Sequence, residues 1–387
     1  MNSGKYVFAQ LTEFLPQRVF DTIVFRYQGN KRIRHFGCWN QLLCMLFGQL
    51  THRDSLRDLI VVLEAHRKKS YHLGLGKSVT RSNLAKANEK RNYRIFEEFA
   101  YHLIAIARKK RANEDFEIKG KVYAFDSSTI DLCLSVFWWA TFRKKKAGIK
   151  LHTLYDIVTQ IPAFIHITEA TVNDMNAMDL IPYEAGAYYI FDRGYVDYTR
   201  LYRITLHEAY FVIRAKSNLK FNRIYSRKVD KETGVLCDQI GKLSGTKTGK
   251  QYPEKIRRIK YYDSETKRTF VFLTNNMELS ALQIALLYKN RWQVELFFKW
   301  IKQHLKIKSF WGTTENAVRI QIYSAIIAYC LVAIVGAELK IKHSTYEILQ
   351  IVGISLLDKT PINELFANTD YKNVKEINHN QLTINWI

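Results

Sequence analysis

Between about residues 121 and 214 the sequence alternates short apolar runs with amphipathic ones in a fixed order. Five runs have the length and composition of β-strands, and two of the stretches between them carry apolar residues at helical spacing. The predicted strands cover residues 122–126, 149–155, 161–167, 188–192 and 210–214, and the predicted helices cover residues 173–181 and 198–207. Such an alternation is typical of a mixed sheet with helices packed against it.

The order of these elements, three strands, helix, strand, helix, strand, is the order of a ribonuclease-H-like mixed sheet. From about residue 217 to 276 the alternation stops, and a glycine-containing stretch leads into two strand-like runs, 256–262 and 269–273, with a turn between them. This pattern predicts a β-rich insertion closed by a hairpin. The predicted fold class is therefore α/β: a ribonuclease-H-like catalytic domain with a β-rich insertion, preceded by a mostly helical N-terminal domain.

The charge of the chain indicates a polyanionic partner. There are 59 Lys and Arg residues against 36 Asp and Glu residues, and the resulting net charge of +23 is spread along the chain rather than confined to a tail. Nucleic acid is the obvious partner for such a surface, and a charge that serves only solubility is the alternative.

The chain divides into five predicted segments. The first is helical, because residues 39–50, 55–65 and 94–110 each carry apolar residues at helical spacing. The segments are a helical N-terminal DNA-binding domain at 1–112, the first part of the ribonuclease-H-like domain at 113–216, the β-rich insertion at 217–276, catalytic-domain helices at 277–345 and a C-terminal segment at 346–387.

The sequence predicts a cytoplasmic protein. Its five cysteines are odd in number, widely spaced and without a CxxC pair, which indicates reduced thiols rather than a disulfide framework or a zinc site. The N-terminus shows no clear signal-peptide pattern. The longest apolar run, residues 322–337, is shorter than the ~20 residues of a membrane span, and a buried core helix is the better interpretation.

One run near residue 290 places a single carboxylate among cations. Wound as a helix, it carries Glu295 on one narrow sector opposite an apolar back. The polar side chains on or near that sector are Tyr288, Arg291, Glu295, Lys299, Lys302 and Lys306. A lone acid on a basic face suggests a metal ligand held against a polyanion, and a salt-bridged surface helix is the alternative.

Two aspartates are the natural partners of Glu295. Asp126 and Asp192 each follow an apolar strand, at the end of an open sheet where functional sites gather. If the helix crosses neighbouring strands, three carboxylates converge, which is enough to bind two divalent cations about 3.5–4 Å apart. Hard oxygen ligands and phosphate chemistry favour Mg²⁺, with Mn²⁺ as a substitute, and nearby cations including Arg193 would offset phosphate charge. Taken alone, either aspartate is equally well explained as a cap or a turn residue.

Four blocks of the sequence carry a family resemblance. The spacing of Tyr288, Arg291, Glu295 and Lys302 matches a Y-x2-R-x3-E-x6-K signature at every position. The other three blocks are Phe125-Asp126-Ser-Ser-Thr129, Gly148-Ile-Lys150-Leu-His152 and Phe191-Asp192-Arg193-Gly194-Tyr195. In this order they resemble bacterial insertion-sequence transposases of the DDE superfamily, in the IS-four-type branch that has this signature. The resemblance spans about residues 120–335.

The resemblance implies a function and a site. It implies a metal-binding triad of Asp126, Asp192 and Glu295, with Tyr288, Arg291 and Lys302 holding the phosphates of transposon ends. It also implies DNA cleavage at terminal inverted repeats and joining of the ends to double-stranded target DNA, by two protomers in one synaptic complex. Such a protein would act on the nucleoid in the bacterial cytoplasm.

Two further DNA contacts are predicted, each with an alternative beside it. Thr80 or Ser82 caps a short helix whose first turns offer Arg81, Asn83 and Lys86 to DNA, and a solvated connector is the other interpretation. Trp292 stands at the edge of the active face, where it would stack on an extruded base, whereas a core position is the more common place for a tryptophan.

Two other functions remain open on the sequence alone. One is a ribonuclease-H-like nuclease or resolvase that cleaves DNA without joining it. The other is a DNA-binding repressor descended from a transposase, although an intact set of three acids counts against it.

Overall fold

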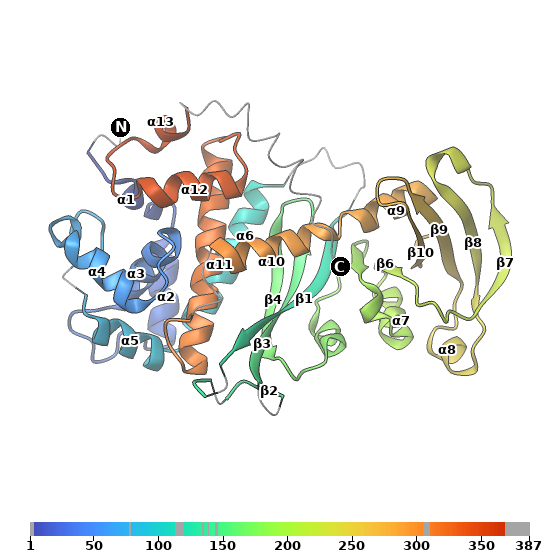
Figure 1. Ribbon diagram of the computed structural model, residues 1–387, viewed down its shortest axis with the longest axis horizontal. Helices are drawn as coiled ribbons and strands as arrows, with labels where there is room; N and C mark the ends of the chain where they lie inside the picture. Colours follow the sequence, from blue (N-terminus) through green and yellow to red (C-terminus); the bar gives the residue numbers. More distant parts are fainter. Residues whose placement is uncertain are drawn as a thin grey trace.

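The structure is a computed structural model that describes residues 4–76, 79–112, 120–133, 135–137, 139–143, 146–304 and 310–367. Its centre is one mixed β-sheet with helices on both faces, flanked by a helical region on one side and by the β-rich insertion on the other (Figure 1). Lys306 and residues 368–387 of the C-terminal segment predicted at 346–387 lie outside the described residues.

The strands of the described residues form a single ten-stranded sheet, in the order β2-β3-β1-β5-β6-β10-β9-β8-β7 with β4 also paired to β3. The pairs β1–β5 and β5–β6 are parallel, and the other pairs are antiparallel. The bounds are β1 Val122–Leu132, β2 Thr141–Arg143, β3 Lys146–Asp156, β4 Ile161–Glu169, β5 Tyr188–Phe191, β6 Tyr210–Arg214, β7 Phe221–Arg227, β8 Val235–Leu243, β9 Ile256–Asp263 and β10 Arg268–Thr274.

Alternating side chains give the central strands two apolar faces, because successive residues of a strand point to opposite sides. On one face, Val122, Ala124 and Ile190 pack into a large core that contains the helices α9, α10 and α11. On the other, Phe125 and Phe191 pack into a smaller core under η2, η3 and α7. The bounds are η2 Asp174–Leu180, η3 Arg193–Tyr195, α7 Tyr198–Leu206, η4 Lys231–Thr233, α8 Thr246–Gln251, α9 Ala281–Lys289, α10 Trp292–His304 and α11 Glu315–Glu338.

The helical N-terminal region shares the large core of the sheet. Its helices pack around α11, which in turn contacts α3, α5 and α6, while α6 contacts strand β4. The bounds are α1 Val7–Thr12, α2 Gln17–Arg26, α3 Cys38–Leu50, α4 Leu56–Ala65, η1 Arg67–Lys69, α5 Arg81–Lys90 and α6 Arg94–Lys110, followed at the far end of the chain by α12 Thr345–Ser355 and α13 Ile362–Ala367. The helices predicted at 39–50, 55–65 and 94–110 are confirmed to within one residue.

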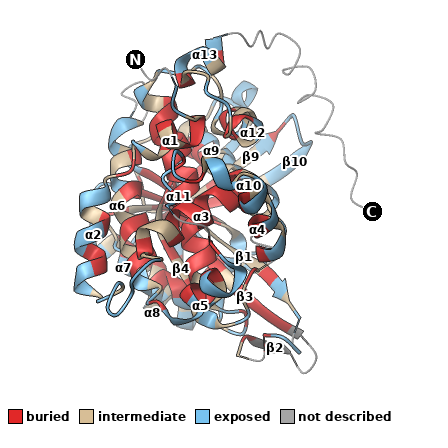
Figure 2. Cartoon of the chain, turned by 90° about the vertical axis from the view of Figure 1, so that its left-hand side faces the viewer, coloured by how far each residue is buried: buried red, intermediate tan, exposed pale blue. Residues whose placement is uncertain are grey.

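Helix α11 is the core helix that the apolar run predicted. It begins at Glu315, seven residues before that run, and its 24 residues are long and apolar enough to cross a membrane. However, 89% of its most apolar window is buried inside the protein, where the N-terminal helices and the sheet surround it (Figure 2). The expectation of a buried core helix is therefore confirmed, and the helix is longer than predicted.

Two local predictions are corrected. The first strand does not end at Asp126 but continues to Leu132, because β3 keeps pairing with it beyond the end of β5. The helix predicted at 173–181 is the 3₁₀ helix η2, whose cap is Asn173: its side chain accepts a hydrogen bond from the Met175 amide. The hairpin predicted to close the insertion is confirmed as β9 and β10, and β10 also pairs with β6, so the insertion extends the central sheet.

Candidate active site

Asp126 and Asp192 lie side by side at the edge where the parallel pairing of β1 and β5 ends. The last paired residues are Phe125 and Phe191, so each aspartate is the next residue along its chain. Because Phe125 and Phe191 point into the smaller core, the following residue of each strand points toward the opposite face, where α9 and α10 lie. Two neighbouring strands thus present two carboxylates to the same helices.

The run near residue 290, wound as one helix from the sequence alone, is divided between two helices. Ser280 caps α9 with a capping box to Gln283, α9 ends at Lys289, and α10 begins at Trp292. Between them the amides of Arg291, Gln293 and Val294 each donate to the carbonyl three residues back, which tightens the backbone locally.

The break lets each polar side chain of the run reach a different part of the sheet. The Tyr288 hydroxyl donates to Asp192 Oδ1 over 3.1 Å. Arg291 Nη1 donates to Asp126 Oδ2 over 3.1 Å, and its Nη2 donates to Glu295 Oε1 over 2.5 Å. Further along α10, Lys302 Nζ donates to the carbonyl of Thr129 over 2.7 Å. All four residues of the Y-R-E-K spacing thus lie at one site, gathered around β1 and β5.

Arg291 is the centre of this arrangement. Its side chain is only 17% exposed, and it bridges acids that are 169 positions apart in the chain, Asp126 and Glu295. Neighbouring acids and the Tyr288 oxygen raise its pKa above the ordinary value even though burial, the strongest influence, acts in the opposite direction. Its Nε donor is buried and has no hydrogen-bond partner among the described residues. A buried, unsatisfied donor is costly, so this N–H is suited to an incoming acceptor.

The two aspartates have opposite pKa shifts. Burial raises the pKa of Asp126 to about 6, and the charges of Glu295 and Asp192 add to this, while the Ser127 amide and Arg291 act against it. Burial also acts on Asp192, but the Arg193 amide, Arg291 and the Tyr288 hydroxyl outweigh it and lower the pKa of that carboxyl. Because neighbouring carboxylates repel each other, a cation bound at this place would stabilise their charged forms.

The donor chemistry of the three acids fits a divalent cation of the Mg²⁺ type, which prefers carboxylate oxygens. Within the described part of the chain, no three acid, histidine or cysteine side chains are grouped closely enough to hold one ion. The guanidinium of Arg291 lies between Asp126 and Glu295 instead and partly neutralises them. The acids therefore fit the metal by their oxygen chemistry, while in this structure Arg291 links Asp126 and Glu295.

The remaining predicted contacts lie at varied distances from the acids. Arg193 follows Asp192 and is exposed, as is Lys299 on α10. Trp292 is 48% exposed and lines a cavity of about 270 Å³ with Leu296, Trp300 and residues of other elements. Trp292 is therefore not the core residue that its alternative interpretation assumed.

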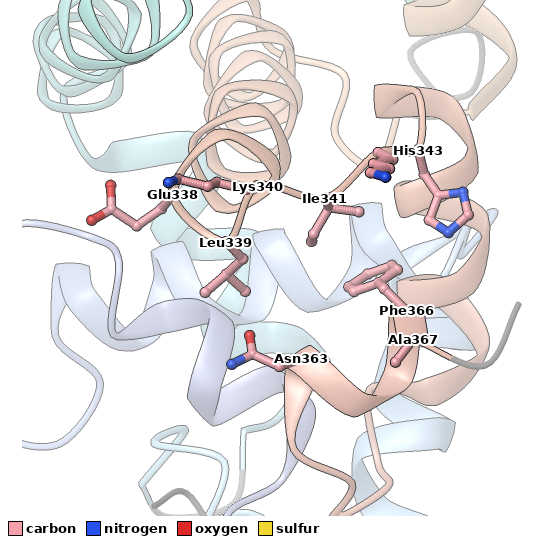
Figure 3. A pocket seen from close by; sticks show the side chains of 9 residues that line it. Glu338, Leu339, Lys340, Ile341, His343, Asn363, Phe366 and Ala367 are labelled. Atoms are coloured by element: carbon pink, nitrogen blue, oxygen red, sulfur yellow. The ribbon is translucent and has the colours of Figure 1, made fainter.

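The N-terminal candidates are not brought to the acids. Thr80 caps α5 by accepting from the Asn83 amide, and Arg81, Asn83 and Lys86 are exposed. Helix α5 packs on α3, α4 and α11, at the side of the molecule away from the insertion (Figure 1). A cavity of about 710 Å³ between the end of α11 and α13 (Figure 3) is also unrelated to the site, since its described lining holds none of the candidate residues.

Tyr195 is a site residue whose role sequence reasoning missed. It lies on η3, three residues after Asp192, and its hydroxyl donates to Asp126 Oδ1 over 3.5 Å. Its ring packs edge-on against Phe125, with 5.4 Å between the ring centroids. The D-R-G-Y block contained the signal, because a short turn after a strand returns its third residue to the neighbouring strand. Tyr195 thus ties the chain after β5 to the acid on β1.

His152, in the G-x-K-x-H block, lies behind the site rather than in it. Its side chain is fully buried, with Nε2 2.9 Å from Thr168 Oγ1 and Nδ1 4.0 Å from Asp174 Oδ1. Burial lowers the pKa of His152 to about 4, and the positive charges of His166 and Lys150 act in the same direction against the attraction of Asp174. The folded protein therefore holds a neutral imidazole where an unfolded chain would hold one with a pKa near 6.5.

This burial gives a pH dependence of stability. Below pH 6.5 the unfolded chain binds a proton at His152 that the folded chain refuses until about pH 4, so stability falls as the pH falls through that window. Between pH 7 and 5 the contribution is about 2 kcal/mol. We expect His152→Gln, which can still bond Thr168, to remove that part of the difference in urea unfolding between the two pH values. An unchanged pH dependence would contradict the assignment.

Comparison with known proteins finds a matching protein family and several similar proteins. Residues 117–331 match the family described as transposase DDE domain, and residues 3–76 match a domain of unknown function. The chain is 37% identical over 257 residues to a protein of Sinorhizobium fredii named as a transposase, covering 65% of this chain and 70% of that one.

Two further relatives carry the name of an insertion sequence. A transposase for the insertion sequence element IS5377 of Geobacillus stearothermophilus is 32% identical over 212 residues, which is 53% of this chain and 54% of the relative. A transposase for the element IS4SA of Synechocystis is 27% identical over 263 residues, which is 66% of this chain and 72% of the relative. All three stretches are long enough to include much of the sheet and its helices.

Proposed function

The chain belongs to the DDE transposases, metal-dependent enzymes of insertion sequences, and we propose that it binds the terminal inverted repeats of its element, cleaves the DNA there and joins the 3′ ends to target DNA. The observation that carries this proposal is the double contact of Arg291 with Asp126 and Glu295, beside the Tyr288–Asp192 hydrogen bond. Acids from two strands and one helix meet there among cations.

Asp126, Asp192 and Glu295 are proposed as the catalytic and metal-binding triad. Bound Mg²⁺, or Mn²⁺ in its place, would supply activation of the attacking oxygen and charge stabilisation at the scissile phosphate. The chain supports that role by holding the three acids through residues of one run: Arg291 contacts Asp126 and Glu295, and Tyr288 contacts Asp192. Arg291 keeps Asp126 and Glu295 paired until such a partner takes its place.

Tyr288, Arg291 and Lys302 are proposed to hold DNA phosphates next to the triad. Arg291 has a buried Nε donor with no partner in the described residues, so a phosphate oxygen would satisfy it. Lys299, Lys306 and Trp292 on or beyond α10 and Arg193 after β5 are proposed as further contacts, with Arg81, Asn83 and Lys86 of α5 as more distant ones. Trp292, half exposed beside a cavity, has room for a stacked base.

The topology supports a ribonuclease-H-like fold for the central sheet. The strands β4, β3, β1, β5 and β6 are neighbours in that order, with β3 antiparallel to β1 and with β5 and β6 parallel to it. We propose the same division into five segments as above, with the N-terminal region 1–112 binding DNA. We also propose that two copies hold the two ends in one synaptic complex on the bacterial nucleoid, since two ends must be cut and joined together.

A strand-cleavage assay tests the proposed function. Purified protein is mixed with duplex DNA that spans the inverted repeat and its flanking sequence, with a supercoiled target plasmid, and with Mg²⁺ or EDTA. We expect nicks at the repeat ends and joined products with Mg²⁺, neither with EDTA, and loss of both in Asp126→Ala and Asp192→Ala. Cleavage without joined products would support the nuclease alternative, and cleavage unaffected by these substitutions would refute the triad.

A further inference from the structure

A groove lined by cations lies beside Asp192, on the β-rich insertion. It has a volume of about 540 Å³, and its lining comes from the turn after β5, the end of β6 and strands β7 to β10. The cations of the lining are Arg193, Arg214, Lys216, Arg223 and Arg258. No aspartate or glutamate belongs to the lining in the described part of the chain. We call this feature the insertion groove.

The charge of the insertion groove is available to an external anion. Among the described residues, none of its five cations makes an ion pair with an acid. Two neighbours on β9 show the contrast. Arg257 is 1% exposed and paired with Asp238, whereas Arg258 points to the other face of the sheet, is half-buried and has no acidic partner there. Asp238 thus balances the charge of the inward Arg257, whereas no acid among the described residues pairs with the outward Arg258.

The guanidinium groups of the groove are held in place by uncharged partners. Arg258 Nη1 donates to Gln239 Oε1 over 2.7 Å from the adjacent strand, and its guanidinium lies 6.0 Å from the ring centroid of Phe221. The guanidinium of Arg214 lies 5.2 Å from the ring centroid of Phe270. A guanidinium has five N–H donors, so these contacts orient the group and leave donors for an oxyanion.

The groove and the candidate active site meet at Asp192. Arg193 lines the groove, and its backbone amide is hydrogen-bonded to the Asp192 carboxylate. Arg214, at the end of β6, contributes to the low pKa of Asp192 through its charge. The groove thus begins at the residue that directly follows Asp192.

We propose that the insertion groove binds the sugar–phosphate backbone of the DNA strand that adjoins the scissile phosphate. The proposal rests on the proposed function, because it takes the acids at Asp192 to be the place of cleavage. Planar guanidinium groups match phosphate oxygens in pairs, and a groove without carboxylates imposes no repulsion on a polyanion. The insertion thereby forms a second DNA contact, separate from that of Tyr288, Arg291 and Lys302.

Salt-dependent DNA binding tests the groove without any chemistry. The probe is a fluorescein-labelled 30-base-pair duplex in EDTA, with affinity measured by anisotropy at increasing NaCl concentration. Each phosphate contact contributes about 0.9 to the slope of log affinity against log salt. We expect the slope to fall by about 0.9 for Arg223→Ala and by about twice that when Arg258→Ala is added, with binding at 0.1 M salt weakened by roughly 8-fold and 60-fold.

The matched control removes the same charge from the same insertion. Lys228→Ala with Lys231→Ala alters exposed residues at the β7–β8 turn that do not line the groove, and it should leave the slope within 0.3 of wild type, as estimated from the same rule. If the salt slope fell equally in both double variants, the effect would be one of net charge alone, and the proposal would be overturned. The Arg223 side chain is exposed and makes no side-chain hydrogen bond or ion pair with the described residues, so its single variant stays informative if Arg258→Ala lowers the melting temperature.

A photocrosslink locates the DNA directly. Benzoylphenylalanine placed at Ser217, which is exposed and lines the groove, should crosslink to the duplex, and the same group at Lys228 should not. Displacement of the duplex by micromolar thymidine 5′-monophosphate at constant ionic strength would identify a free-nucleotide site and overturn the proposal. An unchanged salt slope in Arg223→Ala together with normal cleavage would refute the groove proposal alone. Cleavage that persists in Asp126→Ala and Asp192→Ala would refute the proposed function alone.

Discussion

Replacing Glu295 by glutamine is expected to lower the rate of Mg²⁺-dependent DNA cleavage by about 10³-fold or more. A metal ligand contributes several kcal/mol to the transition state, and each 1.36 kcal/mol corresponds to a factor of ten. The Glu295 side chain is 55% exposed, and its recorded contact is with Arg291, so glutamine should preserve the fold. DNA affinity in EDTA should stay within a few-fold of wild type, because the phosphate contacts remain.

Helix α11 offers a closely matched control for this change. Glu315 is 53% exposed and bonds Arg319 one helical turn away, an arginine that is 19% exposed. The pair thus copies the spacing and exposure of Arg291 and Glu295, at a place without other carboxylates in contact with the arginine among the described residues. Glu315→Gln should leave cleavage unchanged. Equal cleavage by Glu295→Gln and wild type would remove Glu295 from the triad.

Replacing Asp238 by alanine is expected to destabilise the protein by about 3–5 kcal/mol, because it leaves a buried positive charge without a partner. Arg257 donates from Nε and Nη2 to the two Asp238 oxygens over 2.8 and 2.7 Å, and the side chains are 1% and 5% exposed. Its Nη1 also donates to the carbonyl of Leu279, immediately before the cap of α9. Urea unfolding at pH 7 measures the loss.

The control for Asp238 is an exposed ion pair in the same region. Glu265 and Lys289 join the β9–β10 turn to the end of α9, with side chains that are 71% and 45% exposed. Glu265→Ala should cost less than about 1 kcal/mol, because solvent screens such pairs. A similar loss in the free energy of unfolding for both substitutions would show that the buried ion pair stabilises the fold no more than the exposed one.

The sequence predicted the elements of the sheet better than their extent. Strand composition located five strands of the central sheet, and the end of β5 at Phe191 placed Asp192 correctly. The length of β1 was missed, since residues 127–132 include serines, a threonine and an aspartate and lack an apolar alternation. Pairing with β3 extends the strand, and such tertiary hydrogen bonds leave no local mark in the sequence.

The sequence proposed the residues of the candidate site but not the break between α9 and α10 that positions them. Spacing placed Tyr288, Arg291 and Glu295 on one helical sector, whereas the break after Lys289 sends Tyr288 to Asp192 and Arg291 to Asp126. The residues at the break contain neither proline nor glycine. The two helices are fixed by burial of Ala285, Leu287 and Val294 in the core, a tertiary effect that helical periodicity does not contain.

The pairing of β10 with β6 fixes the distance between the insertion and the acids. A module joined by flexible linkers would let a bound strand slide relative to the acids, but backbone hydrogen bonds fix the spacing from β5 through β6 and β10 to β9. Three strand spacings amount to about 14 Å. If the proposed DNA contact of the groove holds, a phosphate bound by Arg258 would therefore lie at a fixed distance from a phosphate bound at Asp192.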